Sequence, residues 1–295
     1  TLDIQGDLAW QFWPSLGVSL GRTEARIADE EELFAALDAA SVSVAVLPLL
    51  YGQVEMDGIT LAGLDVNLVE GPDGANWEQI GPQTTAEETP EETPADPEGE
   101  SSSLDIPLTI PSVAITDGKV RYRNTADGTD IVVEHFNLNA QDVNLDEAFP
   151  LQMSLRYQDQ SDMRVDLNLE TTLTANLDAN HFILDPMTLD ANIAGATTMP
   201  VDVHLEQKLD VNLNEDTVSI KDLLLTAAGT ETRGNIDITA LTGDMQLSGK
   251  LATAPFDANK VLEAIGEAPI ETTDSKALSN IAMETTLGGE PGSIM

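Results

Sequence analysis

The sequence predicts a mostly β protein with a few short helices, built on an elongated, curved antiparallel sheet that forms an open apolar groove. Apolar and polar residues alternate with the period of a β-strand along most of the 295 residues, and the stretch MRVDLNLETTL at 163–173 is long for one strand. Only two segments have helical periodicity, and two short helices cannot cover one face of so many strands. The sheet must therefore curl into an open groove or, as the alternative, fold over on itself as a closed β-sandwich.

Residues 1–80 are predicted to form an N-terminal β domain with a short helix. Strand patterns occur at Leu2–Leu8 and again in SVSVAVL, QVEMDGITLAG and LDVNLVE. The helix is expected in ADEEELFAALDAA at 28–40, where Asp29 can act as the N-cap and the glutamates that follow suit the positive end of a helix. Leu33, Phe34 and Leu37 would then share one helical face.

The remaining chain divides into three parts by composition. Residues 81–103 contain four prolines, seven acidic residues and no large apolar side chain, so they are predicted to form a disordered acidic insertion. Residues 104–253 are almost wholly strand-like and predict a long antiparallel β-groove, with tight-turn signals at Asp117-Gly118 and Asp127-Gly128. Residues 254–295 predict a helix, capped by Asp257 and ended by Gly266, and the truncated start of a further β module. Because the sequence starts and stops in mid-pattern, we expect it to be a piece of a longer chain.

The alternation also predicts which side chains line the groove. Two long segments, at 163–173 and 201–213, place their apolar residues on one face of an extended chain and their charged or amide residues on the other. The predicted lining consists of Met163, Val165, Leu167, Leu169, Val203, Leu205, Val211 and Leu213. For each of these residues, the interior of a closed sandwich remains the alternative position.

Charge and motif content exclude several functional classes. Thirteen basic and 52 acidic side chains give a formal net charge of −39, which opposes binding to nucleic acid. The chain has no cysteine, no apolar run long enough to span a bilayer, and no phosphate-binding loop, nucleophile elbow or HExxH motif. His135, His181 and His204 fall in separate segments, and Asp142, Asn144 and Asp146 lack the glycine of a calcium loop. We therefore expect neither an enzyme nor a metal or cofactor site.

The aromatic cluster Trp10, Phe12 and Trp13 allows two interpretations. It could anchor the domain at a membrane interface, which tryptophan favours, or it could close one end of the core. Core packing is the expectation for this cluster. Trp77 is expected to be a structural residue in its turn.

Four phrases, in order along nearly the whole chain, resemble the AsmA family of bacterial envelope proteins. They are GDLAWQFWPSLGVSLG with the apolar SVSVAVLPLLYGQVEMDGITLAG that follows, the turn EGPDGANWEQI, the strand pair IPSVAITDGKVRYRN, and LSGKLATAPFDANKVLEAIGEAPI. The resemblance implies a periplasmic domain anchored to the inner membrane of a Gram-negative cell by an N-terminal transmembrane helix that this sequence lacks.

The resemblance also implies a function. AsmA-like proteins look related to TamB and to chorein-type bridge proteins, whose curved sheets present an apolar concave face along which phospholipid acyl chains are thought to slide. The expected function is therefore binding of phospholipid and its transfer between the inner and outer membranes. A module that assists outer-membrane protein assembly, by presenting sheet edges to an envelope protein partner, is the alternative.

Overall fold

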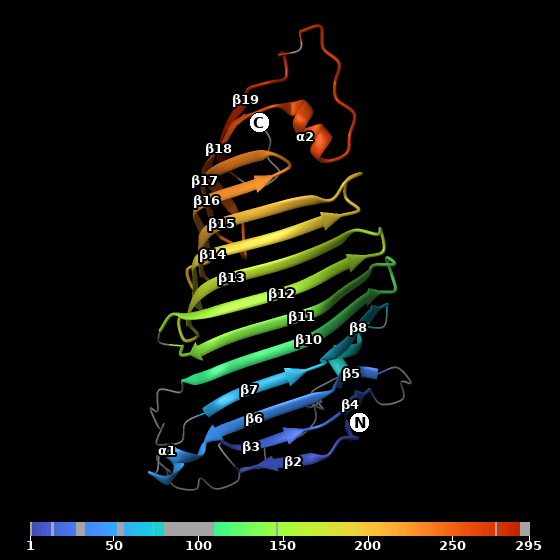
Figure 1. Ribbon diagram of the computed structural model, residues 1–295, viewed down its shortest axis with the longest axis vertical. Helices are drawn as coiled ribbons and strands as arrows, with labels where there is room; N and C mark the ends of the chain where they lie inside the picture. Colours follow the sequence, from blue (N-terminus) through green and yellow to red (C-terminus); the bar gives the residue numbers. More distant parts are fainter. Residues whose placement is uncertain are drawn as a thin grey trace, which may run out of the picture.

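A computed structural model describes residues 2–12, 15–27, 33–51, 56–72, 74–79, 109–145, 147–274 and 276–289 of the chain. The described residues form one sheet of 19 strands, together with two α-helices and one short 3-10 helix. The strands stack along the long axis of the molecule, with β2 near one end and β19 near the other (Figure 1).

The first half of the sheet consists of short strands, and the second half of long ones. The N-terminal elements are β1 (Leu2–Ile4), β2 (Leu8–Gln11), β3 (Ser15–Leu20), β4 (Thr23–Arg26), β5 (Leu33–Leu37), β6 (Ala39–Ala45), α1 (Val46–Leu50), β7 (Met56–Ala62), β8 (Asp65–Gly71), β9 (Gly74–Ala75) and η1 (Asn76–Gln79). The later elements are β10 (Ile110–Asn124), β11 (Asp130–Val143), β12 (Phe149–Asp159), β13 (Arg164–Asn176), β14 (His181–Ala194), β15 (Val201–Asn212), β16 (Thr217–Ala227), β17 (Thr230–Thr239), β18 (Gln246–Phe256), α2 (Ala258–Ala264) and β19 (Ile281–Gly289).

From β10 to β19, each strand pairs antiparallel with the next strand along the chain. This is the arrangement that short turns between alternating segments impose. Gly128 supplies the positive φ of 82° that the predicted Asp127-Gly128 turn requires. Residues 164–173 of the stretch MRVDLNLETTL lie within β13, a single strand of 13 residues, and Met163 immediately precedes it.

One pairing departs from the predicted antiparallel order. β10 runs parallel to β7 over its first half and parallel to β8 over its second half, whereas the other described ladders are antiparallel. Parallel neighbours need a long crossover between them. The connection from η1 to β10 contains residues 81–103, the predicted acidic insertion, which lies outside the described residues.

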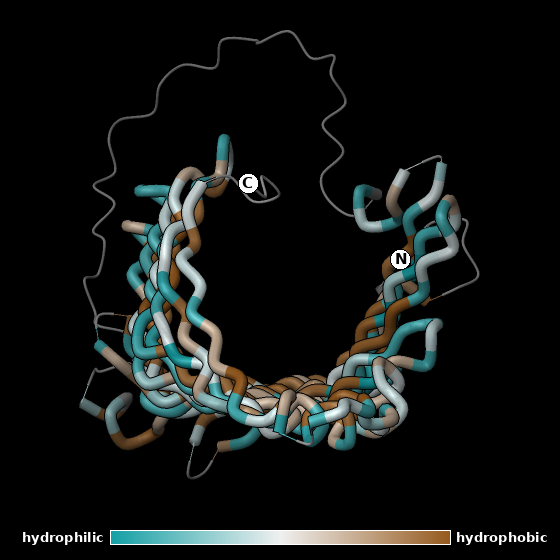
Figure 2. Tube along the Cα trace, turned by 90° about the horizontal axis from the view of Figure 1, so that it is seen from above, coloured by the Kyte–Doolittle hydropathy of each residue, from teal (hydrophilic) through white to brown (hydrophobic). Residues whose placement is uncertain are grey.

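The sheet curves into an open trough. Seen along the long axis, the trace forms two walls and a floor and leaves one side open (Figure 2). This confirms the predicted mostly β, curved and open sheet, and the alternative of a closed β-sandwich is wrong. The physical reason is the absence of a second layer, because the two described α-helices contain only five and seven residues.

Two local predictions are wrong. The described part of the predicted helix, residues 33–40, forms β5 and the start of β6, because both strands find partners on the sheet; residues 28–32, including Asp29, lie outside the described residues. Asp117-Gly118 is no turn, since Asp117 takes a φ of 51° inside the continuous strand β10 and forms a bulge there. The second helix is confirmed as α2, with the Asp257 carboxylate accepting hydrogen bonds from two backbone N–H groups.

The aromatic residues also divide between prediction and correction. Trp10 and Phe12 are 60% and 69% exposed, so the expected core packing is wrong for both; Trp13 lies outside the described residues. Trp77 agrees with its predicted structural role, because its ring lies 6.3 Å from that of Tyr122. Trp77 and Tyr122 thereby tie η1 to β10.

Candidate functional site

The central feature of the trough is a row of aliphatic side chains that runs across the strands. Residues paired directly between neighbouring strands project from the same face of a sheet. The row passes through Leu61, Ile115, Leu138, Met153, Leu169, Leu189, Leu205 and Leu225, one from each of β7 and β10–β16. At a strand spacing of about 4.8 Å, these eight strands span about 34 Å. Towards the N-terminal end, the row continues through Ala40, Leu20 and Leu8.

Further rows lie on either side of the central row and extend the apolar surface along the length of the strands. One flanking row contains Val66, Val120, Val133, Tyr157, Val165, Ile193 and Val201, and a shorter one contains Leu155, Leu167, Ala191, Val203 and Ala227. On the other side lie Phe149, Leu173, Leu184, Leu209, Ile220 and Ile236, followed by Ala175, Phe182, Val211, Val218, Ile238 and Leu247. The apolar face therefore extends along and across the sheet, with the polar side chains of Thr171 and Gln207 in the row next to the central one.

β-bulges keep these rows on one face. Asp117 in β10, His135 in β11 and Asp222 in β16 each have a φ between 51° and 53°, and each coincides with a register shift in its ladder. One extra residue inverts the alternation, so the apolar residues change from odd to even positions, or the reverse, at each bulge. Asn137 and Asn235 fix two of the bulges, since their side-chain oxygens accept hydrogen bonds of 3.0 Å from the backbone N–H groups of Asp117 and Asp222.

The apolar face is the inner face of the trough. In Figure 2, the hydrophobic parts of the trace lie towards the inside and the hydrophilic parts towards the outside. Within β13, Leu169 is only 8% exposed, whereas its neighbours Asn168 and Glu170 are exposed. Yet among the described residues no large side chain is fully buried. Neighbouring side chains shield one another on the concave surface, but no protein layer covers them.

The outer face carries the charge. Arg156 Nε donates to Asp166 at 2.6 Å, and Asn192 donates to Asp202 at 2.7 Å across neighbouring strands. The His204 ring lies between two carboxylates, with Nδ1 2.7 Å from Asp190 and Nε2 3.1 Å from Glu206. The hydrogen bond to Asp190, followed by that to Glu206, raises the pKa of His204 above its ordinary value. Among the described residues, no group of three potential ligands is arranged to hold a metal ion.

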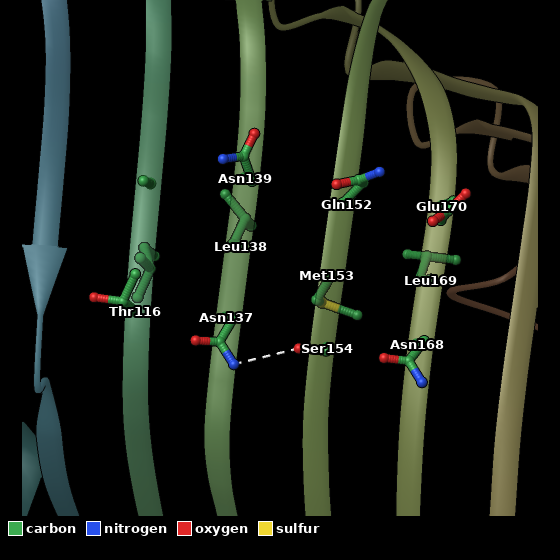
Figure 3. A pocket seen from close by; sticks show the side chains of 12 residues that line it. Thr116, Asn137, Leu138, Asn139, Gln152, Met153, Ser154, Asn168, Leu169 and Glu170 are labelled. Carbon is green, nitrogen blue, oxygen red and sulfur yellow. Dashed lines mark hydrogen bonds between the residues drawn. The ribbon is translucent and has the colours of Figure 1, made fainter.

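A shallow pocket lies on β10–β13 (Figure 3). Its lining includes Asn137, Asn139, Gln152, Ser154, Asn168 and Glu170. These residues alternate with members of the central apolar row and therefore project from the opposite face. Asn137 donates a hydrogen bond of 3.3 Å to Ser154 there. Four members of the central row, Ile115, Leu138, Met153 and Leu169, also contribute to the lining.

The structure places six of the eight predicted lining residues in the apolar rows. Leu169 and Leu205 belong to the central row, Val165, Leu167 and Val203 to the rows beside it, and Val211 to the opposite wall. Met163 and Leu213 lie in turns at opposite rims. Met163 is half-buried before β13, and Leu213 is 54% exposed after β15.

Alternation within two segments could not find the rest of the lining. Leu138, Met153, Leu189 and Leu225 are equal members of the central row, and each lies in a segment that alternates clearly in sequence. Three of these residues lie on strands interrupted by a bulge or register shift, so alternation alone assigns the two halves of the strand to different faces. Cross-strand register is the signal that unites them.

This arrangement can hold an extended hydrocarbon by apolar contact. The inner face offers aliphatic side chains without charge in the central row, and the open side gives a polar group attached to the hydrocarbon direct access to water. Among the described residues, no helix is long and apolar enough to cross a membrane.

Comparison with known proteins identifies one family. The family model described as AsmA family matches residues 1–154, which is just over half of the 295 residues. Searches of curated proteins and of solved structures give no match to the chain.

Proposed function

The chain belongs to the AsmA family, and we propose that its trough binds the acyl chains of phospholipids and supports their transfer between the inner and outer membranes of a bacterial envelope. Family membership supports a general role in envelope lipid transport or assembly. The continuous apolar row on an uncovered inner face supports the specific proposal that the trough binds acyl chains. In this proposal the domain lies in the periplasm and the protein is anchored to the inner membrane.

Burial of acyl chains supplies the binding energy in this proposal. Each methylene removed from water contributes about 0.8 kcal/mol, with little dependence on the contacts it makes. A surface of leucine, valine, isoleucine and methionine therefore offers similar energy at successive positions, and a bound chain meets only low barriers as it moves along. The negative outer face does not oppose binding, because the attraction acts on the inner face and is not electrostatic.

An uncovered apolar surface also needs an occupant. Soluble monomers rarely expose contiguous apolar patches beyond a few hundred Å². The inner face continues over eight strands in its central row alone. Bound lipid would cover it in the envelope, and this covering is the single consideration that carries the proposal.

The assembly role remains a second candidate because of one edge strand. β19 pairs with β18, and within the described residues no strand pairs with its other side. Such an edge can accept a strand from a partner protein. A chain that contains no lipid, but forms a backbone ladder with an outer-membrane protein strand, would favour this role.

Site-specific photo-cross-linking tests the proposed function. A photoreactive side chain would replace Leu189 or Leu205 on the inner face and, as matched controls, Asp190 or Glu206 on the outer face of the same strands. The proposal predicts phospholipid adducts in cells for the two inner positions only. Equal adducts at inner and outer positions, or none at any, would contradict it.

A further inference from the structure

The N-terminal end of the trough exposes an unusual group of large apolar side chains. Trp10, Phe12, Leu47, Leu50 and Tyr51 are 60%, 69%, 58%, 73% and 85% exposed. We refer to these five residues as the N-terminal corner. Isolated exposed apolar residues are normal on a protein surface, whereas a cluster of this kind marks a contact surface.

The five residues come from two segments that the sheet brings together. β3 pairs with β2 on one side and with β6 on the other, and Ser15 faces Ala45 in that second ladder. Phe12 directly follows the end of β2, and α1, which contains Leu47 and Leu50, directly follows the end of β6. In Figure 1, α1 and the nearby end of β2 lie at the same end of the molecule.

The two segments contain no charged residue. Residues 8–21 and 39–54 lack Asp, Glu, Lys and Arg, although charged residues make up 22% of the chain. Polar positions on their strands are filled by serine and glycine, as in Gly17, Ser19 and Ser43. The segments that form the corner are thus uncharged on a molecule with a formal net charge of −39, and the carboxylate of Asp57 beside them accepts hydrogen bonds from Ser15 and Ser43.

The corner continues the apolar face of the trough. Trp10 pairs with Val18, Val18 with Val42, and Val42 with Ile59. Ile59 pairs in turn with Val113 of β10, so one row joins the corner to the long strands. A hydrocarbon leaving a membrane that contacts the corner would find an unbroken apolar path into the trough.

We propose that the N-terminal corner inserts into the interfacial layer of a zwitterionic lipid bilayer. Charge separates this occupant from the others: a second copy of the chain would bring its own charge of −39, and an anionic surface would likewise be repelled. A zwitterionic surface has no net charge and accepts an uncharged apolar corner. Tryptophan and tyrosine rings favour the interfacial layer because one end is apolar and the other polar, which suits Trp10 and Tyr51.

Vesicle flotation tests this inference. The purified 295-residue chain would be mixed with phosphatidylcholine vesicles, and the floated fraction compared for wild type, Phe12→Asp and Leu50→Asp. Leu177→Asp is the matched control, because Leu177 is a leucine of similar exposure, 55%, in the turn after β13 and far from the corner. We expect both corner variants to bind vesicles at least tenfold more weakly, and Leu177→Asp to bind like wild type. Replacing part of the phosphatidylcholine by phosphatidylglycerol should weaken wild-type binding at low salt.

Three results would overturn the inference. Wild type could fail to float; Leu177→Asp could lose binding as strongly as Leu50→Asp; or Leu50→Asp could abolish a wild-type dimer, which would make the corner a self-contact. Circular dichroism of each variant would show that its fold is retained. The inference rests on the proposed function, because the bilayer at the corner would be the donor membrane for lipid transfer. The two are tested separately. Phospholipid cross-linked at Leu205 should persist in Leu50→Asp, whereas failure of transfer itself would remove that adduct and leave flotation intact.

Discussion

A charge placed on the inner face should weaken lipid binding strongly while leaving the fold intact. Leu167 and Asn168 are neighbours on β13, but Leu167 belongs to an inner row and pairs with Leu155 and Ala191, whereas Asn168 is exposed on the outer face. Leu167→Asp and Asn168→Asp therefore add the same carboxylate to opposite faces of one strand. The outer face already holds many carboxylates, so Asn168→Asp serves as the matched control.

The size of the effect follows from the strand spacing. An acyl chain lying across the strands passes Leu167 for about 4.8 Å, which is the length of about four methylenes in an extended chain. Keeping these methylenes away from a hydrated carboxylate removes about 0.8 kcal/mol each, or about 3.2 kcal/mol in total. At about 1.4 kcal/mol per tenfold change, Leu167→Asp should weaken acyl-chain binding by roughly 200-fold.

Stability should respond much less. Leu167 is only half-buried, and a carboxylate at this position can be hydrated from the open side of the trough. We expect Leu167→Asp to lower the free energy of unfolding by about 1–2 kcal/mol. The same charge enclosed in a closed core would lower it by about 4 kcal/mol. Titration with a fluorescent fatty acid measures binding, and urea unfolding measures stability. Equal binding by both variants, or unfolding of Leu167→Asp at neutral pH, would refute the reasoning.

Three further predictions concern the frame of the trough. Because the pKa of His204 is raised in the folded state, its contacts with carboxylates stabilise the fold fully below the unfolded-state pKa of about 6.5. This stabilisation is lost as the pH rises through the folded-state pKa. In urea unfolding, the difference in stability between wild type and His204→Gln should therefore shrink with rising pH. A difference independent of pH would contradict this prediction. Gly195→Ala should lower the free energy of unfolding by about 1–3 kcal/mol, because φ at Gly195 is 86° and an added Cβ would lie 2.3 Å from the Asp162 carbonyl oxygen. Gly128→Ala should lower it less, because φ at Gly128 is 82° but no atom lies within 4 Å of the added Cβ. Asp257→Ala removes the side chain that accepts from the N–H groups of Asn259 and Lys260, at a cost of about 1 kcal/mol, and hydrogen exchange should accelerate in α2 but not in β13.

Alternation of side chains made much of this fold predictable from sequence. The register is regular over residues 164–171 of β13 and residues 201–206 of β15. The following residues therefore share a face, as their spacing indicates: Val165, Leu167, Leu169, Val203 and Leu205. The small number of predicted helices indicated that one face of the sheet stays without a helical layer, but it left both an open groove and a closed sandwich possible. The pairing of all described strands in one sheet decides between them.

The errors arose where long-range pairing decides the structure. Leu33–Leu37 has helical spacing, but β4 and β8 provide ladder partners that no local pattern reveals. Asp117 has the sequence of a turn residue, yet Asn137 on the next strand holds it in a bulge. The parallel pairing of β10 with β7 depends on a crossover and leaves no periodic signal. Trp10 is a large apolar residue of the kind expected in a core, but it is exposed because it lies near the end of the trough.

Native mass spectrometry of the purified chain, with lipid extraction from the same sample, tests the central claim most directly. The proposed function predicts that the chain carries phospholipid at a stoichiometric level and that Leu167→Asp carries far less than Asn168→Asp. A folded chain with a lipid-free mass, in wild type and in both variants, would contradict the claim that its trough is a lipid-binding groove.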